Sequence, residues 1–414
     1  MHTAAATWDT PMPHAKPAAP AAVTGLSICI PVLNEEDAIA ETLDRCLATV
    51  APLAATGVTS VEIIVVDDGS TDGTADIVRK YPDVRLVQHP VNRGYGAALK
   101  TGFAAATHDI VGFLDADATY PPEQFPLLCR TLVEQEADLV IGSRMAGADT
   151  EMPAVRRLGN KFFAALLTLV GRTVVTDSAS GMRVFRRPTL ELLSPLPDGL
   201  NLTPVMSTRA VHEGIKVVEV AIPYRERVGE SKLSVTKDGL RFLSTILWTV
   251  LAYNPVRLFG LVGLAGIGVA LLVGVGLVAL RLQGVTELGT WGTFAVFAAL
   301  VCGVAGVSVF ATGASFNYLV SLFYERPIRQ GLFRKPLFAR PIEGVFLPAG
   351  LLSTLAGVVV AGASLVLSRQ GWPVERLWLY LSASGLAILV GLQLVTSWLI
   401  MSVLRELSVR ERAR

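Results

Sequence analysis

The stretch "IVGFLDADATYPPE", residues 110–123, ends an apolar run with two carboxylates one residue apart. The β-branched and aromatic residues of "IVGFL" favour a buried strand. Side chains two positions apart on a strand point in the same direction. Asp115 and Asp117 can therefore converge on one ion where this strand ends, and carboxylate oxygens suit Mg²⁺ or Mn²⁺.

Four more apolar runs of this kind alternate with helical patterns, such as those over 35–50 and 94–107. The runs are "LSICIPVL" (26–33), "VEIIVVDD" (61–68), "VRLVQHP" (84–90) and "DLVIGSR" (138–144). Such an alternation predicts an α/β fold with a mostly parallel sheet covered on both faces. Ligands of these sheets bind at the carboxyl ends of the strands. Polar residues gather there in this chain: Asn34, Glu35, Asp67, Asp68, Asp115, Asp117, Ser143 and Arg144.

The second half of the chain is far more apolar than the first. Four long stretches lack charged residues: Leu258–Leu280, Leu288–Tyr324, Gly344–Ser368 and Leu377–Leu404. Each exceeds the about 20 residues that cross a bilayer. Buried core helices of a large soluble domain are the alternative, but four such runs in series are hard to bury otherwise. The sequence therefore predicts four transmembrane helices.

Basic residues in the connecting segments predict the orientation of these helices. Nine lie after the second and fourth stretches: Arg326, Arg329, Arg334, Lys335, Arg340, Arg405, Arg410, Arg412 and Arg414. Only Arg281, Arg369 and Arg376 lie in the other two connections. We therefore expect a multi-pass protein of the cytoplasmic (plasma) membrane, with the α/β domain and both termini in the cytosol.

The segment "LRFLSTILWTVLAYNPVR" (240–257) joins the two halves and is too short to span a bilayer. Its flanking arginines, with Trp248 and Tyr253, favour an amphipathic helix in the membrane interface, and a cytosolic core helix is the alternative. The expected organisation is a disordered tail (1–24), an α/β domain (25–235), this interfacial helix (236–256), four transmembrane helices (257–404) and a cytosolic basic tail (405–414).

Several site classes are excluded. No G-x-x-x-x-G-K-[ST] sequence occurs, and "GYGAALKTG" (94–102) lacks the third glycine of a dinucleotide site and follows the third strand. The net charge of +1 gives no reason to expect a nucleic acid partner. The histidines are scattered and indicate no site. The sequence leaves the oligomeric state open.

Four motifs, in this order and spacing, resemble the family 2 inverting glycosyltransferases of GT-A (nucleotide-diphospho-sugar transferase) fold. They are "IPVLNEE" (30–36), "VVDDGSTDGT" (65–74), "NRGYGAALKTG" (92–102) and "FLDADATYPPE" (113–123). "DSASGMRVF" (177–185) and "RVGESKLS" (227–234) resemble the dolichyl-phosphate-mannose synthase branch. The resemblance implies inverting, metal-dependent transfer of one sugar from a UDP- or GDP-linked donor to a polyprenyl (dolichyl or undecaprenyl) phosphate at the cytosolic membrane face.

The resemblance also assigns the donor site. It implies that Asp115 and Asp117 hold the metal, which neutralises the departing diphosphate. Asp68 would accept a hydrogen bond from the base, although "DDGS" is also good turn chemistry and one of Asp67 and Asp68 is expected to be structural. The remaining nucleotide-binding residues are expected to be Pro31, Val32, Leu33, Glu35 and Ala116. The branch often has Gln where this chain has Thr119.

The acceptor determines which further groups are needed. A phosphate monoester has a second pKa near 6, so at neutral pH it is already a nucleophile and needs cations rather than a base. The resemblance implies that Arg144, Arg227 and one of Arg156 and Arg157 bind phosphates, together with Ser231 and Lys232. Arg227 and Lys232 join the two metal-binding aspartates as expected catalytic residues.

Two other functions stay open at this point. In one, the acceptor is a lipid or protein hydroxyl, which requires a base, and Asp177 is the only candidate; otherwise Asp177 is structural. In the other, the chain is a glycolipid carrier or scaffold whose α/β domain only binds nucleotide. The near absence of charged residues in the apolar stretches argues against such a polar pathway.

Replacing Lys232 with Ala is expected to raise KM for the lipid acceptor more than KM for the nucleotide sugar, because Lys232 lies in the segment that leads to the membrane. Steady-state kinetics with each substrate varied in turn measure both constants. An equal rise in the two would contradict the assignment.

Overall fold

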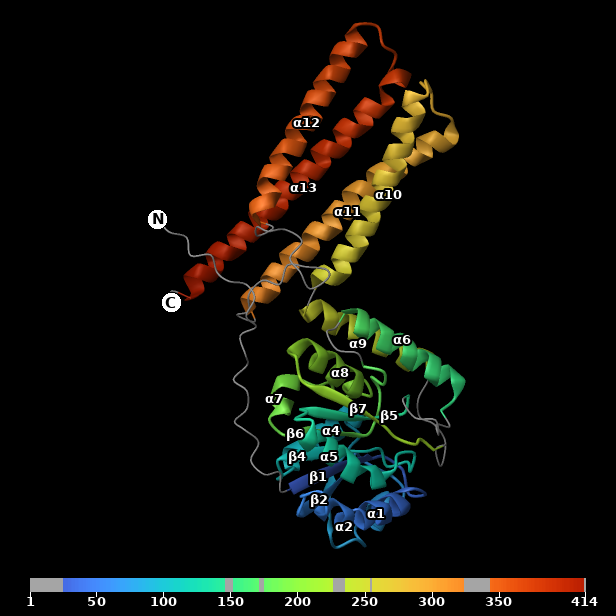
Figure 1. Cartoon of the computed structure of the whole chain (residues 1–414), viewed down its shortest axis with the longest axis vertical. Coiled ribbons are helices and arrows are strands. Elements are labelled where there is room, and N and C mark those ends of the chain that lie inside the picture. Colours follow the sequence, from blue (N-terminus) through green and yellow to red (C-terminus); the bar gives the residue numbers. More distant parts are fainter. Residues whose placement is uncertain are drawn as a thin grey trace. The chain divides into compact units, whose positions relative to one another are not determined.

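The computed structural model describes residues 25–145, 152–170, 175–225, 235–253, 255–323 and 343–412. The chain divides into two compact units, Met1–Thr249 and Val250–Arg414 (Figure 1). The division follows the change from alternating strands and helices to long apolar helices.

The first unit is built on a seven-stranded sheet of order β3-β2-β1-β4-β6-β5-β7. The strands are β1 (Gly25–Val32), β2 (Ser60–Asp67), β3 (Val84–Gln88), β4 (Ile110–Phe113), β5 (Leu139–Ser143), β6 (Arg183–Arg186) and β7 (Val217–Ala221). Only β6 is antiparallel to its neighbours, β4 and β5, among the paired strands of the described sheet. The predicted mostly parallel sheet and its five strands are confirmed.

β6 and β7 were not predicted from the sequence. β6 has four residues and an arginine at each end, and β7 ("VVEVA") carries a glutamate at its centre. Neither shows the continuous apolar run that identified the other strands. The antiparallel direction of β6 has a consequence for the site. Since Phe113 pairs with Arg183, the residues before β6 lie beside the residues that follow β4.

Helices cover both faces of the sheet. On one face, Ile28 and Ile30 of β1 lie in a core with α1 (Ile39–Ala48) and α5 (Phe125–Glu134). On the other face, Cys29 lies in a core with α4 (Tyr95–Ala105). The other helices are α2 (Val50–Ala54), α3 (Thr74–Val78), η1 (Pro122–Gln124), α6 (Ala154–Val170), α7 (Thr189–Leu193), α8 (Leu202–Glu213) and α9 (Val235–Tyr253). Each fully buried aliphatic side chain stabilises this arrangement by about 1.5–3 kcal/mol.

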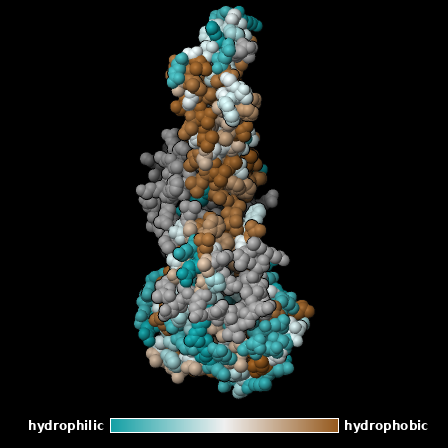
Figure 2. Space-filling view, turned by 90° about the vertical axis from the view of Figure 1, so that its right-hand side faces the viewer, coloured by the Kyte–Doolittle hydropathy of each residue, from teal (hydrophilic) through white to brown (hydrophobic). Residues whose placement is uncertain are grey.

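The second unit consists of four long helices, α10 (Pro255–Leu282), α11 (Thr290–Phe323), α12 (Glu343–Arg369) and α13 (Val374–Arg412). Each contains a window long and apolar enough to cross a membrane, as predicted. Hydrophobic residues cover the visible face of these helices (Figure 2). The segment 405–414, expected to be a separate tail, instead continues α13 as far as Arg412. The predicted tail 1–24 lies outside the described residues.

Glycines let the helices of the second unit pack backbone against backbone. A Cβ at Gly306 of α11 would lie 2.7 Å from the backbone nitrogen of Ile267 and 2.8 Å from the carbonyl oxygen of Gly263, both in α10. In the pair α12 and α13, Ser353 Oγ donates a hydrogen bond of 2.8 Å to the carbonyl oxygen of Ala387. Small residues and interhelical hydrogen bonds are the usual means of helix association in lipid.

Replacing Gly306 with Ala is expected to force α10 and α11 apart and to destabilise the second unit by about 1–3 kcal/mol. Gly276→Ala on α10 is the matched control, because a Cβ there meets nothing within 4 Å. Thermal unfolding of the purified chain in detergent compares the two variants. Equal unfolding midpoints would show that the close packing of α10 and α11 is wrong.

Candidate active site

Asp115 and Asp117 follow β4, and other side chains fix both of them. The hydroxyl of Tyr95 donates to Asp115 Oδ1 at 2.7 Å. Thr119 donates to Asp117 Oδ1 from its hydroxyl at 2.6 Å and from its backbone nitrogen at 3.3 Å. Ala118, between Asp117 and Thr119, has a φ of +58°. This left-handed conformation is rare for residues other than glycine and often marks functional sites. The two carboxylates are half-buried, so they remain accessible to a ligand.

The turn before β6 lies directly against Asp115. A Cβ on Gly181 would be 2.2 Å from Asp115 Oδ2, so any other residue there would displace the Asp115 carboxylate. The backbone nitrogen of Gly181 donates to the hydroxyl of Tyr120 at 2.7 Å. Arg183, which is fully buried, donates to the carbonyl oxygens of Ser180 and Ser178 at 3.0 and 2.8 Å. Burial lowers the pKa of Arg183 to about 10, so it still carries its charge at neutral pH.

Arg144 and Asp177 form a buried ion pair next to this turn. The guanidinium donates from Nε to Oδ2 at 2.8 Å and from NH2 to Oδ1 at 2.7 Å, and the backbone nitrogen of Arg144 donates to Oδ2 at 2.9 Å. The guanidinium carbon lies 5.9 and 5.4 Å from the ring centroids of Tyr120 and Tyr224, within cation–π range. Burial opposes ionisation of Asp177, but the charge and hydrogen bonds of Arg144 hold its pKa below the ordinary value.

Asp177 has two further partners. Asn160 of α6 donates to its Oδ1 at 3.1 Å, and Glu219 of β7 accepts from its backbone nitrogen at 2.9 Å. Both carboxylate oxygens of Asp177 are thus engaged, and its side chain is completely buried. Proton acceptance from an acceptor hydroxyl would require this network to break.

Both carboxylates at the end of β2 hold loops. Asp67 accepts from the backbone of Ser70 and from the amide of Gln88, each at 2.9 Å. Asp68 accepts from the backbone nitrogens of Arg93 and Gly94 at 2.9 and 2.7 Å. One of the two aspartates was expected to be structural, and in the structure each of them accepts hydrogen bonds from a loop.

His89 also contacts Asp68, although the sequence provided no reason to assign this histidine to a site. Its Nδ1 lies 2.7 Å from Asp68 Oδ1, and its Nε2 lies 2.9 Å from the hydroxyl of Thr101. Gly69 and Gly94 have φ values of +82° and +104°, which explains why glycines stand in these turns.

The other residues predicted to bind the nucleotide lie at the same edge of the sheet. Pro31 and Val32 are buried at the end of β1, and Glu35 in the following loop donates its backbone nitrogen to Thr74 Oγ1 at 2.9 Å. Leu33 is half-buried between them. Ala116 is buried, and its carbonyl oxygen accepts from Thr42 Oγ1 at 3.0 Å.

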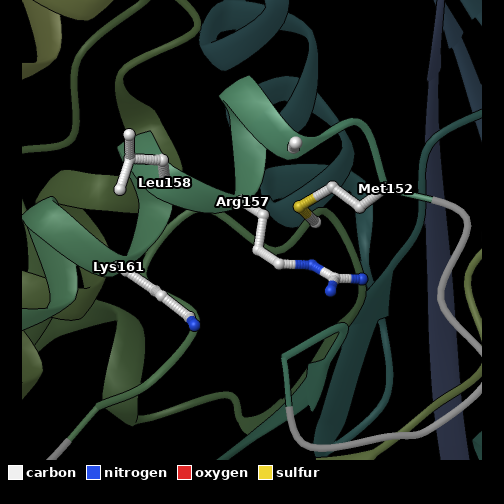
Figure 3. Close-up of a pocket in the computed structure, with 5 residues that line it drawn as sticks. Met152, Arg157, Leu158 and Lys161 are labelled. Atoms are coloured by element: carbon white, nitrogen blue, oxygen red, sulfur yellow. The ribbon is translucent and has the colours of Figure 1, made fainter.

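The predicted phosphate-binding residues are only partly described. Arg157 and Lys161 lie one turn apart on α6 and extend toward one hollow of about 320 Å³, which Met152, Ala154 and Leu158 also line (Figure 3). Arg227, Ser231, Lys232 and the side chain of Arg156 lie outside the described residues. Arg144 faces Asp177 rather than an open space.

The donor set suits a metal bound together with a ligand. Within the described residues, no group of three or more His, Cys, Asp or Glu side chains forms a complete cage. Two carboxylates alone are the arrangement by which proteins hold Mg²⁺ or Mn²⁺ on substrate phosphates, which supply the other oxygens. Asp115 and Asp117 fit that role.

Comparisons with known proteins give the family. The Glycosyl transferase family 2 profile matches residues 27–193, and a domain of unknown function (DUF8752) matches 255–414. An undecaprenyl-phosphate 4-deoxy-4-formamido-L-arabinose transferase of Photorhabdus laumondii is 30% identical over 314 residues, which are 74% of this chain and 92% of the relative. A dolichyl-phosphate hexose transferase of Haloferax volcanii is 34% identical over 219 residues, which are 52% of this chain and 89% of the relative.

The chain belongs to the family 2 glycosyltransferases. Among solved structures, the glucosyl-3-phosphoglycerate synthase of Mycobacterium tuberculosis is similar at 25% identity, with a TM-score of 0.45 over 55% of this chain and 80% of that one. The family 2 match over 27–193, the mostly parallel sheet and the four apolar helices agree with the fold predicted from the motifs.

Sequence reasoning missed several residues that surround the metal-binding candidates of this glycosyltransferase. Tyr95 stands between two glycines in "GYGAAL", Tyr120 in "TYPPE", and Gly181 and Arg183 in "SGMRVF". All four belong to motifs that the sequence had singled out. No spacing rule connects Tyr95, Gly181 and Arg183 to Asp115, because they are distant in the sequence and only the folded domain brings them together.

Replacing Asp177 with Asn is expected to destabilise the first unit, by an amount that depends on pH. Because the folded-state pKa of Asp177 is depressed, its ionised form contributes stability above its unfolded pKa. This contribution is lost as the pH falls through the folded pKa. The difference in unfolding midpoint between wild type and variant should therefore be constant from neutral pH down to about 5, and narrow below about 4. A difference that does not change with pH would contradict the ion pair.

Proposed function

We propose that the chain is an inverting, metal-dependent glycosyltransferase that moves one sugar from a nucleotide-diphosphate sugar to a polyprenyl phosphate at the cytosolic membrane face. The environment of Asp177 carries this proposal. This carboxylate, the only base candidate in the sequence, is buried, engaged on both oxygens and paired with Arg144. A hydroxyl acceptor needs a base, whereas a phosphate acceptor does not. The relatives named for undecaprenyl and dolichyl phosphates support the same acceptor class.

The donor would bind across the carboxyl edge of β1, β2 and β4. Asp68 and Glu35 are candidates for the base and ribose, with Pro31, Val32 and Leu33 as the wall of the base pocket. Three hydrogen bonds already fix Asp68, so its orientation does not depend on the ligand. Asp115 and Asp117 would hold Mg²⁺ or Mn²⁺, which neutralises charge on the diphosphate. The nucleotide is UDP- or GDP-linked in this proposal.

The acceptor phosphate would approach from α6 and α9. These helices pack through Phe163 and Phe242, whose ring centroids are 6.2 Å apart. Both expose large apolar side chains, with Phe162 55% and Trp248 71% exposed. Such helices suit the headgroup level of a bilayer, and α10 begins two residues after α9 ends. A lipid phosphate at that level would meet the cations that line the hollow on α6.

In this scheme the residues bind and orient the reactants. Cations on α6, with Arg227 and Lys232 as sequence-based candidates, would hold the acceptor phosphate so that one of its oxygens attacks the anomeric carbon. The bond from that carbon to the donor diphosphate breaks on the opposite side, and the nucleoside diphosphate leaves with the electron pair. A single displacement inverts the configuration, and no proton has to be removed from the acceptor.

The orientation of the membrane helices fits a cytosolic donor. Basic residues are concentrated in 324–342 and 405–414, the connections on the side of the first unit in the sequence-based topology. Four spans put both ends of the chain on the same side, so the glycosyltransferase domain and both termini would then lie in the cytosol.

Membranes containing the chain should transfer label from a UDP- or GDP-sugar to polyprenyl phosphate when Mn²⁺ or Mg²⁺ is present. Asp117→Asn is expected to lower this rate at least about 100-fold, because it removes several kcal/mol of charge stabilisation. Asp83→Asn, which changes an exposed carboxylate before β3, is the matched control. Extraction of acid-labile label into organic solvent measures the product.

Three results would contradict parts of the proposal. Full activity of Asp117→Asn in saturating metal would remove the metal role of this residue. Label on a hydroxyl acceptor, without label on lipid phosphate, would change the acceptor class and make Asp177 the residue to test. If labelled product forms equally well after a chelator has removed the divalent metal, the reaction does not depend on a metal.

A further inference from the structure

Residues 93–95 connect the carboxylate expected to bind the base with a carboxylate expected to bind the metal. Asp68 accepts hydrogen bonds from the backbone nitrogens of Arg93 and Gly94 at 2.9 and 2.7 Å. The next residue, Tyr95, donates its hydroxyl to Asp115 Oδ1 at 2.7 Å. Asp68 and Asp115 are 47 positions apart in the sequence but lie at the two ends of this three-residue link.

The position of Tyr95 is fixed by its surroundings. It is the first residue of α4, and the φ of +104° at Gly94 turns the chain into that helix. A Cβ on Gly96 would lie 2.2 Å from the carbonyl oxygen of Pro197, so the start of α4 is pressed against that loop. The ring of Tyr95 packs against the core that contains Phe103. Its hydroxyl is therefore delivered to Asp115 from a rigid element.

The two aspartates differ in how they are oriented. Asp117 is held by Thr119, two residues further along the same loop. Asp115 is held by a side chain from a different helix on one oxygen, and its other oxygen faces the Gly181 position, where a Cβ would be 2.2 Å away. The carboxylate of Asp115 is thus confined from two sides before any ligand binds.

We propose that Tyr95 is a positioning residue that sets the carboxylate of Asp115 for the metal ion and couples it to the loop held by Asp68. This inference rests on the proposed metal site at Asp115 and Asp117. Groups that orient metal ligands typically change metal affinity by about 10–100-fold when they are removed. Tyr95→Phe keeps the ring and removes the hydroxyl that donates the orienting hydrogen bond to Asp115.

Binding of Mn²⁺ to the purified full chain in detergent is measured with UDP or GDP present, against the same nucleotide without protein, because the diphosphate supplies the other metal ligands. The electron paramagnetic resonance signal of the free ion follows this binding and tests the proposal without turnover. Tyr95→Phe is expected to weaken Mn²⁺ binding about 10-fold. Tyr81→Phe is the matched control, since the Tyr81 hydroxyl donates to Asp44 Oδ1 at 3.0 Å, a tyrosine–aspartate bond outside the site. This control should bind Mn²⁺ as the wild type does.

The kinetic readout separates positioning from general damage. In Tyr95→Phe, the Mn²⁺ concentration for half-maximal rate should rise about 10-fold, while the rate at saturating Mn²⁺ and the unfolding midpoint without metal stay close to wild type. Mn²⁺ binding equal to that of wild type would overturn the proposal. A Tyr95→Phe chain that does not fold would also overturn it, because Tyr95 would then be structural.

Asp115→Asn distinguishes failure of this inference from failure of the proposed function. If Asp115→Asn abolishes Mn²⁺ binding and Tyr95→Phe leaves it intact, the metal site stands and only the role of Tyr95 is wrong. If wild type and Asp115→Asn bind Mn²⁺ equally, or neither binds it, the metal site itself is wrong and the role of Tyr95 falls with it.

Discussion

The buried ion pair between Arg144 and Asp177 is the constraint on which the site depends. Two charges removed from water are tolerated only when geometry and hydrogen bonding are nearly complete, and removal of one partner typically costs about 3–5 kcal/mol. A domain is stable by only about 5–15 kcal/mol in total. Here Asn160 and Glu219 complete the pair, and the turn over 178–181 follows Asp177 directly and is held by Arg183 through the carbonyl oxygens of Ser178 and Ser180. That turn in turn forms the wall behind Asp115.

The ion pair also bears on the role of Arg144. Arg144 was expected to bind phosphate, yet its guanidinium forms a two-pronged contact with Asp177 and lies near two tyrosine rings. In this arrangement its charge is already balanced. Arg157 and Lys161, by contrast, extend toward an open hollow on α6. Among the described residues, the α6 cations therefore line a hollow, whereas the guanidinium at the end of β5 is engaged with Asp177.

How much the sequence could predict depended on whether a feature is local. The long apolar runs identified β1 to β5 and the four helices that are long and apolar enough to cross a membrane, because an apolar run is visible in the local sequence. β6 and β7 were not predicted, because each has only four or five residues, including charged ones, and shows no hydrophobic pattern. Asp115 and Asp117 could be found because two residues share one strand end. Tyr95, Gly181 and His89 could not, because each meets its carboxylate only after strands or helices distant in sequence have packed.

The insertion of β6 between β4 and β5 affects how the protein is made. β4 and β5 do not pair with each other in the described sheet. Both pair with β6, which begins only at Arg183. β5 also needs β7, which ends at Ala221, whereas the first membrane helix begins at Pro255. Since domains generally fold as units during synthesis, the ribosome can deliver every strand of the sheet before it starts the first membrane helix. The sheet of the first unit can then be complete before the apolar helices of the second unit are made.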